Sequence, residues 1–303
     1  MKTKSFWGAL LIVCLLCVGI FIASTRFHLA VPEAQTETYN LDFSPSTYTT
    51  NEYDALKMQQ WYARTVLDKP SSTQAEIKQA REILAINPVK HFYDLQAKGE
   101  EELAALGYPA YQIQAILAFD GSENAIYRAC ASLSTHLLIL NHDKYPDDTR
   151  TLEAKYIFSW NGMPSIRQPD LIALSSDRFF YAEGSGSSTI YYAADVGTER
   201  LVVHPDVKKI TSGNGRAAGI NLSMQEVSGR VGYHPVCGSI TVKFSSRDFR
   251  QTCIQGAYVH AILPTDVDPV ATLPLNLVGT FTRLDVWGKF TDMRLDALVA
   301  HVI

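Results

Sequence analysis

The first residues whose types and spacing could do chemistry are those of the loop Gly184-Ser185-Gly186-Ser187-Ser188. A nucleophile elbow needs the pattern G-x-S-x-G between a strand and a helix, so that the turn exposes the serine hydroxyl. Here Ser185 follows Gly184 directly, and the next segment, Thr189–Ala193, has the composition of a strand. A phosphate-binding loop would add a lysine and a following helix. The pattern therefore predicts a flexible hairpin loop.

The cysteines beyond the N-terminal segment are Cys130, Cys237 and Cys253. In an oxidising compartment they could form at most one internal disulfide, because three is an odd number. Cys237 and Cys253 are expected to open the two strands of one hairpin, which makes them the preferred pair. A bridge from Cys130 to either is an alternative. A cysteine nucleophile with His234 or His260 as base is another, but no local pattern supports the oriented base that a thiolate needs.

The histidines and the acidic clusters do not form a metal-binding pattern. No histidines are paired at the spacing of a zinc site, such as H-x-x-x-H. Asp143, Asp147 and Asp148 gather in one turn, and Asp266 and Asp268 in another. Neither cluster has the ligand density or the glycine of an EF-hand loop. We therefore predict no metal and no cofactor, with a weak calcium site in the first of these turns as the alternative.

The acidic residues inside the expected strands are too scattered to nominate an acid/base pair. A glycosidase needs two carboxylates that flank the bond it cleaves. The candidates lie far apart in the sequence: Glu153, Glu183, Glu226 and Asp285. The sequence therefore nominates no catalytic residue, although a hydrolase whose residues meet only in the fold stays open.

Aromatic side chains on the expected strands are the candidates for ligand binding. Exposed rings can stack on sugars or anchor a protein partner, whereas buried rings belong to the core. We nominate Trp160, Tyr191, Tyr192 and Trp287 as ligand-binding residues, and expect most strand aromatics to be core.

From about Ala129 onward, apolar residues alternate with polar ones, which is typical of β-strands. Ile240, Val242 and Phe244 are one example, separated by Thr241 and Lys243. We therefore expect strands to position the candidate residues in this part of the chain. Such short segments without intervening helices indicate an antiparallel β-sandwich. Strands are expected near 132–141, 151–160, 170–175, 178–183, 188–195, 200–204, 217–227, 238–246, 252–263 and 278–288, followed by a helical turn at Met293–Val299 and a final strand.

The segment Asn51–Asp120 has helical periodicity and clear helix caps. Expected features are an N-cap at Asn51 for a helix to Leu67, a capping box from Thr73 to Glu76, Pro88 in the first turn of a helix, C-terminal caps at Gly99 and Gly107, and a last helix at Ala110–Phe119. The stretch Leu103–Leu117 is a helix–turn–helix, but it has no basic residue between Ala110 and Phe119 to read DNA. We interpret it as a helical hairpin that caps the following domain, with a partner-binding helical module as the alternative.

The N-terminal stretch Phe6–Ala23 is an unbroken apolar run, preceded by Lys2 and Lys4. About 20 apolar residues span a bilayer, and the run is long for the core of a signal peptide. The lysines favour a cytoplasmic N-terminus. We therefore expect a single-pass anchor with the C-terminal part outside the cell membrane, or a secreted protein if the segment is cleaved.

The resulting layout has an anchor or signal segment at 1–28, a stalk at 29–50, a helical module at 51–128 and a β-sandwich at 129–303. This fold class is α+β, mainly β with an N-terminal helical region. The formal net charge of −4 and the export signal argue against nucleic acid as a partner.

The function expected from these features is a non-catalytic binding or assembly role in the cell envelope. The membrane is one partner, through Phe6–Ala23, and an unknown envelope protein or glycan is the other. The alternative is a secreted hydrolase acting on envelope polymers.

Overall fold

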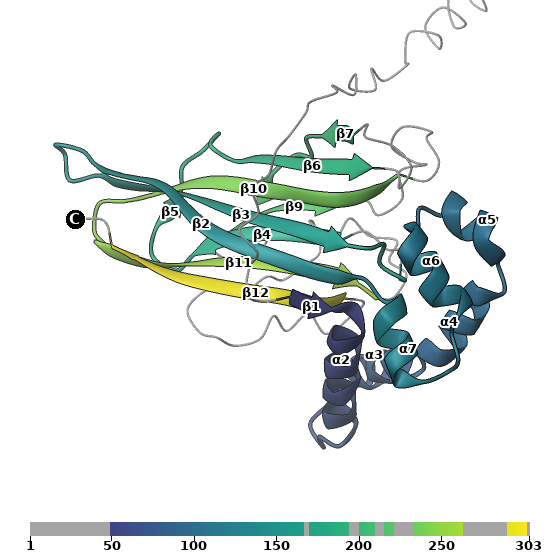
Figure 1. Ribbon diagram of the computed structural model, residues 1–303. Coiled ribbons are helices and arrows are strands. Elements are labelled where there is room, and N and C mark those ends of the chain that lie inside the picture. Colours follow the sequence, from purple (N-terminus) through teal and green to yellow (C-terminus); the bar gives the residue numbers. More distant parts are fainter. Residues whose placement is uncertain are drawn as a thin grey trace, which may run out of the picture. The chain divides into compact units, whose positions relative to one another are not determined.

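The computed structural model describes residues 49–166, 170–193, 200–209, 215–220, 233–262 and 290–301. The chain is an α+β protein in which helices precede a mostly β part, and every strand ladder is antiparallel. Figure 1 shows the helices gathered at one end of two sheets. The helices are α2 (Glu52–Leu67), α3 (Gln74–Leu84), α4 (Pro88–Gln96), α5 (Gly99–Ala105), α6 (Ala110–Leu117) and α7 (Glu123–Ala129).

Most helix ends form where the capping residues predict them, but Gly99, expected as a C-terminal cap, is the first residue of α5. The Asn51 side chain accepts from the Tyr53 amide at the start of α2. Thr73 and Glu76 form the expected capping box of α3, and Pro88 opens α4. Gly107, which follows α5, has a φ of +85°, a backbone conformation that glycine adopts without steric cost. These local signals succeed because a cap satisfies backbone groups within one turn and needs no tertiary partner.

Within the described residues, the first sheet has seven strands, in the order β1-β2-β3-β10-β6-β7, with β5 paired to the end of β10. Inward residues alternate with half-buried ones along β10, where Ile240, Val242 and Phe244 are fully buried. The period-two pattern in the sequence is thereby confirmed. The strands are β1 (Thr49–Asn51), β2 (Ser132–Lys144), β3 (Arg150–Asn161), β10 (His234–Ser246), β6 (Ser187–Ala193), β7 (Arg200–Val203) and β5 (Phe180–Tyr181).

The second sheet has five strands, in the order β12-β11-β4-β9-β8. Its central strand β4 is buried along its whole length. The strands are β12 (Phe290–His301), β11 (Gln251–Ala261), β4 (Asp170–Ser176), β9 (Arg216–Ile220) and β8 (Lys208–Lys209).

One hydrophobic cluster takes side chains from both sheets. Tyr156 and Phe158 of β3 belong to it together with Ile172 of β4 and Ile254 of β11. Two further clusters lie among the helices, and one of them includes Ile262, directly after β11. The main core is therefore shared between the sheets, and the helical cores reach the end of β11.

Three sequence expectations are corrected in this region. Residues Met293–Val299 lie inside strand β12 and form no helical turn. Strands β10 and β11 follow each other in the chain but belong to different sheets, so they do not form a hairpin. The sequence does not predict strands β1 and β8, because three and two residues carry too little periodicity to be recognised, and it also does not predict the seven-residue helix α7.

Several expectations lie outside the described residues: the segment Phe6–Ala23, the stalk up to residue 48 and the strand near 278–288. Residues 49 and 50, expected at the end of the stalk, belong to β1. Within the described ranges, none of the helices combines the length and apolar character that a membrane span requires.

Candidate functional site

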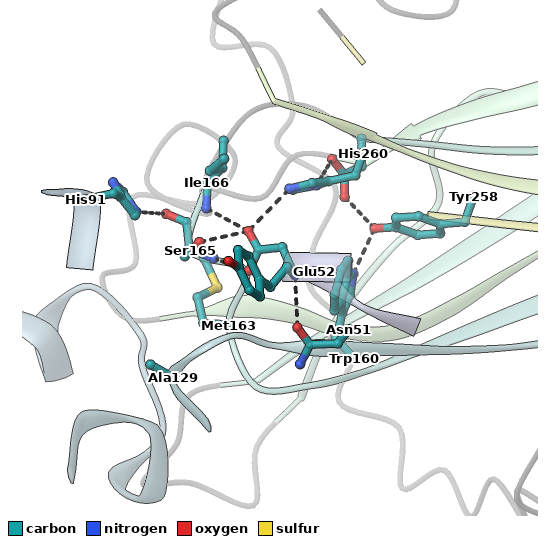
Figure 2. A network of polar contacts seen from close by, with 12 residues as sticks. Asn51, Glu52, His91, Ala129, Trp160, Met163, Ser165, Ile166, Tyr258 and His260 are labelled. Atoms are coloured by element: carbon teal, nitrogen blue, oxygen red, sulfur yellow. Dashed lines mark hydrogen bonds and ion pairs between the residues drawn. The ribbon is translucent and has the colours of Figure 1, made fainter. Parts of the chain in front are cut away.

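A network of buried polar side chains lies where α2 meets the two sheets (Figure 2). Glu52 is the first residue of α2, and its amide donates to the Ala131 carbonyl just before β2. His260 and Asp170 come from β11 and β4 of the other sheet. Since Val259 pairs with Leu171, the next residues His260 and Asp170 are neighbours across the same ladder. The network therefore joins an edge of the first sheet to the centre of the second.

The Glu52 carboxylate accepts hydrogen bonds from the loop that follows β3. The Ser165 amide donates to Oε2 at 2.9 Å, the Ser165 hydroxyl to Oε1 at 2.9 Å and the Ile166 amide to Oε1 at 3.1 Å. His260 Nε2 lies 3.6 Å from Oε1 as an ion pair, too far for a hydrogen bond. Both carboxylate oxygens are thus satisfied although Glu52 is only 4% exposed.

Asp170 holds the other side of the imidazole. His260 Nδ1 donates to Asp170 Oδ1 at 2.8 Å, and the Tyr258 hydroxyl donates to Oδ2 at 2.7 Å. The indole Nε1 of Trp160 donates in turn to the Tyr258 hydroxyl at 2.9 Å. Asp170 and His260 are both fully buried, so the chain of hydrogen bonds runs through the interior.

The electrostatics of the network favour a protonated His260 between two carboxylates. Burial alone would lower its pKa, but the charge and hydrogen bond of Asp170 and the nearby Glu52 raise the pKa of His260 to about 10. Burial raises the pKa of Glu52, but this is outweighed by His260 and by the Ser165 and Ile166 amides, which lower it. Burial and the Asp170 carboxylate raise the pKa of Tyr258 well above its ordinary value.

We expect the stability of the protein to fall between pH 6.5 and 10. The pKa of His260 is raised from 6.5 to about 10 on folding, so its contribution is complete below pH 6.5 and is lost as the pH rises toward 10. The lowered pKa of Glu52 gives a contribution that is lost only as the pH falls below about 4.5. Chemical unfolding should give a free energy about 2–3 kcal/mol smaller at pH 9 than at pH 6. Equal values at the two pH values would contradict a charged His260.

The network is suited to holding elements together and not to acid–base catalysis. A general base must be unprotonated near neutral pH and within reach of substrate. His260 is fully buried, its pKa is raised to about 10, and it faces carboxylates on both ring nitrogens. What the arrangement does is fix the start of α2 against β4 and β11.

Next to this network lies a cavity of about 520 Å³. Its lining comes from Leu56 of α2, Ile86 before α4, Phe92 of α4, Tyr108 after α5 and Ile262 after β11. Most other lining side chains are also apolar, and the polar groups belong to Glu52, Asn87, Lys90, His91, Asp94 and Ser165, together with the hydroxyls of Tyr53 and Tyr108. Small-molecule sites have this size and this mixture of apolar walls and a few polar groups.

Of the aromatic residues nominated from the sequence, Trp160 belongs to the buried network, and Trp160, Tyr191 and Tyr192 do not line the cavity. Trp160, Tyr191 and Tyr192 are 5%, 7% and 2% exposed. Trp160 and Tyr192 belong to the core shared by the sheets, so their ring faces pack against protein and are not presented on the surface. Trp287 lies outside the described residues.

The predicted disulfide between Cys237 and Cys253 is not formed. Both are free thiols, and Cys130 is free as well. Cys237 lies near the start of β10 and pairs with Ser159 in the first sheet, whereas Cys253 pairs with Val299 in the second. The predicted disulfide requires β10 and β11 to form one hairpin. Because the chain passes from the first sheet to the second between these strands, Cys237 and Cys253 do not lie on neighbouring strands.

The remaining candidates have simple local roles. Ser185 lies in the turn between β5 and β6, where its hydroxyl donates to the Ala182 carbonyl. Asp147 accepts from Thr149 and pairs with Arg247, so it joins two turns at the sheet end opposite the helices. Among the described residues, no group of three or more histidine, cysteine or acidic side chains is placed to hold a metal ion.

Sequence reasoning did not find the network. Its members are far apart in the chain, and each has an ordinary local explanation: Glu52 is an acidic residue in the first turn of a helix, and His260 sits in an apolar strand. A weak signal was available, since charged residues in an otherwise buried strand need a partner.

Comparisons with known proteins add only remote likenesses. No protein-family model matches the chain, and no curated protein matches it. Among solved structures, a pore-forming protein has a TM-score of 0.23 and 8% identity, with 43% of this chain and 79% of that one covered. AvmM, described as catalysing macrocyclization in alchivemycin A biosynthesis, has a TM-score of 0.23 and 12% identity, over 55% and 86% of the two chains. The collagen-binding domain of the Erysipelothrix rhusiopathiae surface protein RspB has a TM-score of 0.21 and 8% identity, over 57% and 65%. Likenesses at this level carry no argument about function.

Proposed function

We propose that the chain is an exported cell-envelope protein, tethered by Phe6–Ala23, that binds a ligand without transforming it. The two sheets are proposed to pack face to face as a β-sandwich, with the cavity beside α2 and α4 as the ligand site. The observation that carries this proposal is the cavity of about 520 Å³ with mainly apolar walls. Exposed apolar area inside a fold costs free energy unless something occupies it.

The wall of the cavity is held in place by the buried network. Glu52 and Ser165 line the cavity and are also members of the network. His91 on α4 contacts the Ser165 carbonyl through Nε2 at 3.1 Å, so α4 is tied to the same loop. A wall fixed by several polar contacts is preorganised, which lowers the entropic cost of binding.

The alternative proposal is a secreted hydrolase acting on envelope polymers. Within the described residues, the Asp170–His260 pair has the hydrogen bond of an acid–base pair, but its protonation at neutral pH does not suit a base. The binding role is therefore the better supported of the two.

The test is site-specific photo-crosslinking in the native envelope. A benzophenone amino acid is placed at Ala85, an exposed residue that lines the cavity and caps the end of α3. The matched control is Ala97, an exposed residue in the same right-handed helical conformation that caps the end of α4 and does not line the cavity. We expect one adduct of defined mass at position 85 and none at position 97.

Equal adducts at the two positions, or none at position 85, would contradict a ligand site in the cavity. The full chain would then be assayed for hydrolysis of envelope polymers, and activity there would favour the alternative.

A further inference from the structure

The charged groups around the cavity are compensated by one another. Glu52 is matched by His260 and by three hydrogen-bond donors. Lys90 forms an ion pair with Asp94 one turn further along α4, with Nζ 2.5 Å from Oδ2. His91 Nε2 is engaged with the Ser165 carbonyl. Among the described residues that line the cavity, no charged group lacks a partner.

Because the charged lining groups are already paired, they determine which class of ligand the cavity can bind. A charged headgroup that entered would lose its hydration and find no counter-ion, which is unfavourable. An uncharged apolar molecule that entered would lose only the ordered water around it, and it would gain contacts with the apolar walls of the cavity. Cys130, which lines the cavity as a half-buried thiol, adds to the apolar surface.

We propose that the cavity beside α2 and α4 binds an uncharged, mainly apolar small molecule, such as an uncharged lipid or other neutral amphiphile. The inference rests on the proposed binding function and names the ligand class of that same site. The volume of about 520 Å³ suits a small molecule, and the lining residues come from six separate parts of the chain.

Cys130 provides a direct readout of occupancy. Its thiol lies in the cavity lining, whereas Cys253, also half-buried, lies on β11 and does not line the cavity. The full chain in lipid nanodiscs is treated with iodoacetamide, and the alkylation of each cysteine is followed by peptide mass spectrometry. The competitors are decanol, decanoate and decylammonium, which share a chain length and differ in charge.

We expect decanol to slow the alkylation of Cys130 at least tenfold while Cys253 is unchanged. Decanoate and decylammonium should need at least tenfold higher concentrations for the same protection. The variant Ala85→Trp, which fills the cavity from an exposed position, should lose the protection by decanol, and the control Ala97→Trp should keep it.

The other outcomes overturn the inference. Equal protection by all three competitors would show that charge does not select the ligand, and stronger protection by a charged one would show that the site recognises its headgroup. If decanol did not protect Cys130 from alkylation, the cavity would not be a site for neutral ligands. Failure of the inference is distinguishable from failure of the proposed function, because a charged molecule or a protein crosslinked at position 85 but not at position 97 would refute this ligand class and keep the binding role.

Discussion

Replacing His260 with glutamine is expected to lower the free energy of unfolding at pH 7 by about 3–5 kcal/mol, the usual cost of removing one partner from a buried ion pair. The variant leaves the Glu52 and Asp170 carboxylates buried without the cation that lies between them. Glutamine keeps a polar group of similar length, so the loss measures the charge more than the volume. Chemical unfolding followed by tryptophan fluorescence gives the value.

The pH dependence separates this explanation from simple loss of packing. In the variant, burial still raises the pKa of Glu52 but the charge of His260 no longer lowers it, so stability should increase as the pH falls from 7 to 5. The variant should also lack the decrease between pH 6 and 9 expected of the natural chain.

A suitable control is His136→Gln, at a half-buried histidine on β2. It should cost less than about 1 kcal/mol, as surface-facing substitutions usually do. A loss of similar size in the two variants, or a His260→Gln variant whose stability is independent of pH, would mean that the buried charges do not couple the elements.

Replacing Gly256 with alanine is expected to cost about 1–3 kcal/mol through overpacking. A β-carbon at this position of β11 would lie 2.4 Å from Cδ2 and 2.6 Å from Cγ of Tyr156 on β3. Tyr156 is fully buried in the core shared by the sheets, so protein surrounds its ring. The clash occurs between residues of different sheets, and the loss therefore reports on how closely the sheets pack.

A double-mutant cycle with Tyr156→Leu tests this cause. The smaller side chain leaves space for the new methyl group, so Gly256→Ala should cost at least 1 kcal/mol less in that background. Additive effects of the two substitutions would show that the glycine is required for another reason, and would remove the support for close face-to-face packing.

The local sequence determined the helical part and most strand positions. Asn51, Thr73 and Pro88 mark helix starts because their side chains or ring geometry act within one turn. The alternation of Ile240, Val242 and Phe244 marks a half-buried strand because side chains point to opposite faces of a sheet. These features need only neighbours in the chain, and a single sequence contains them.

Which strands are neighbours was decided only by the tertiary structure. The alternation of apolar and polar residues predicts which face of β10 is buried, but it does not predict that β11 belongs to the other sheet. For this reason the expected disulfide between Cys237 and Cys253 is not found. The same limit hid the site. Glu52, Asp170 and His260 are ordinary residues locally, and they become a charge network only when the start of α2 meets β4 and β11. The cavity likewise forms from side chains of several distant segments, so its volume and its balance of charge exist only in the folded chain.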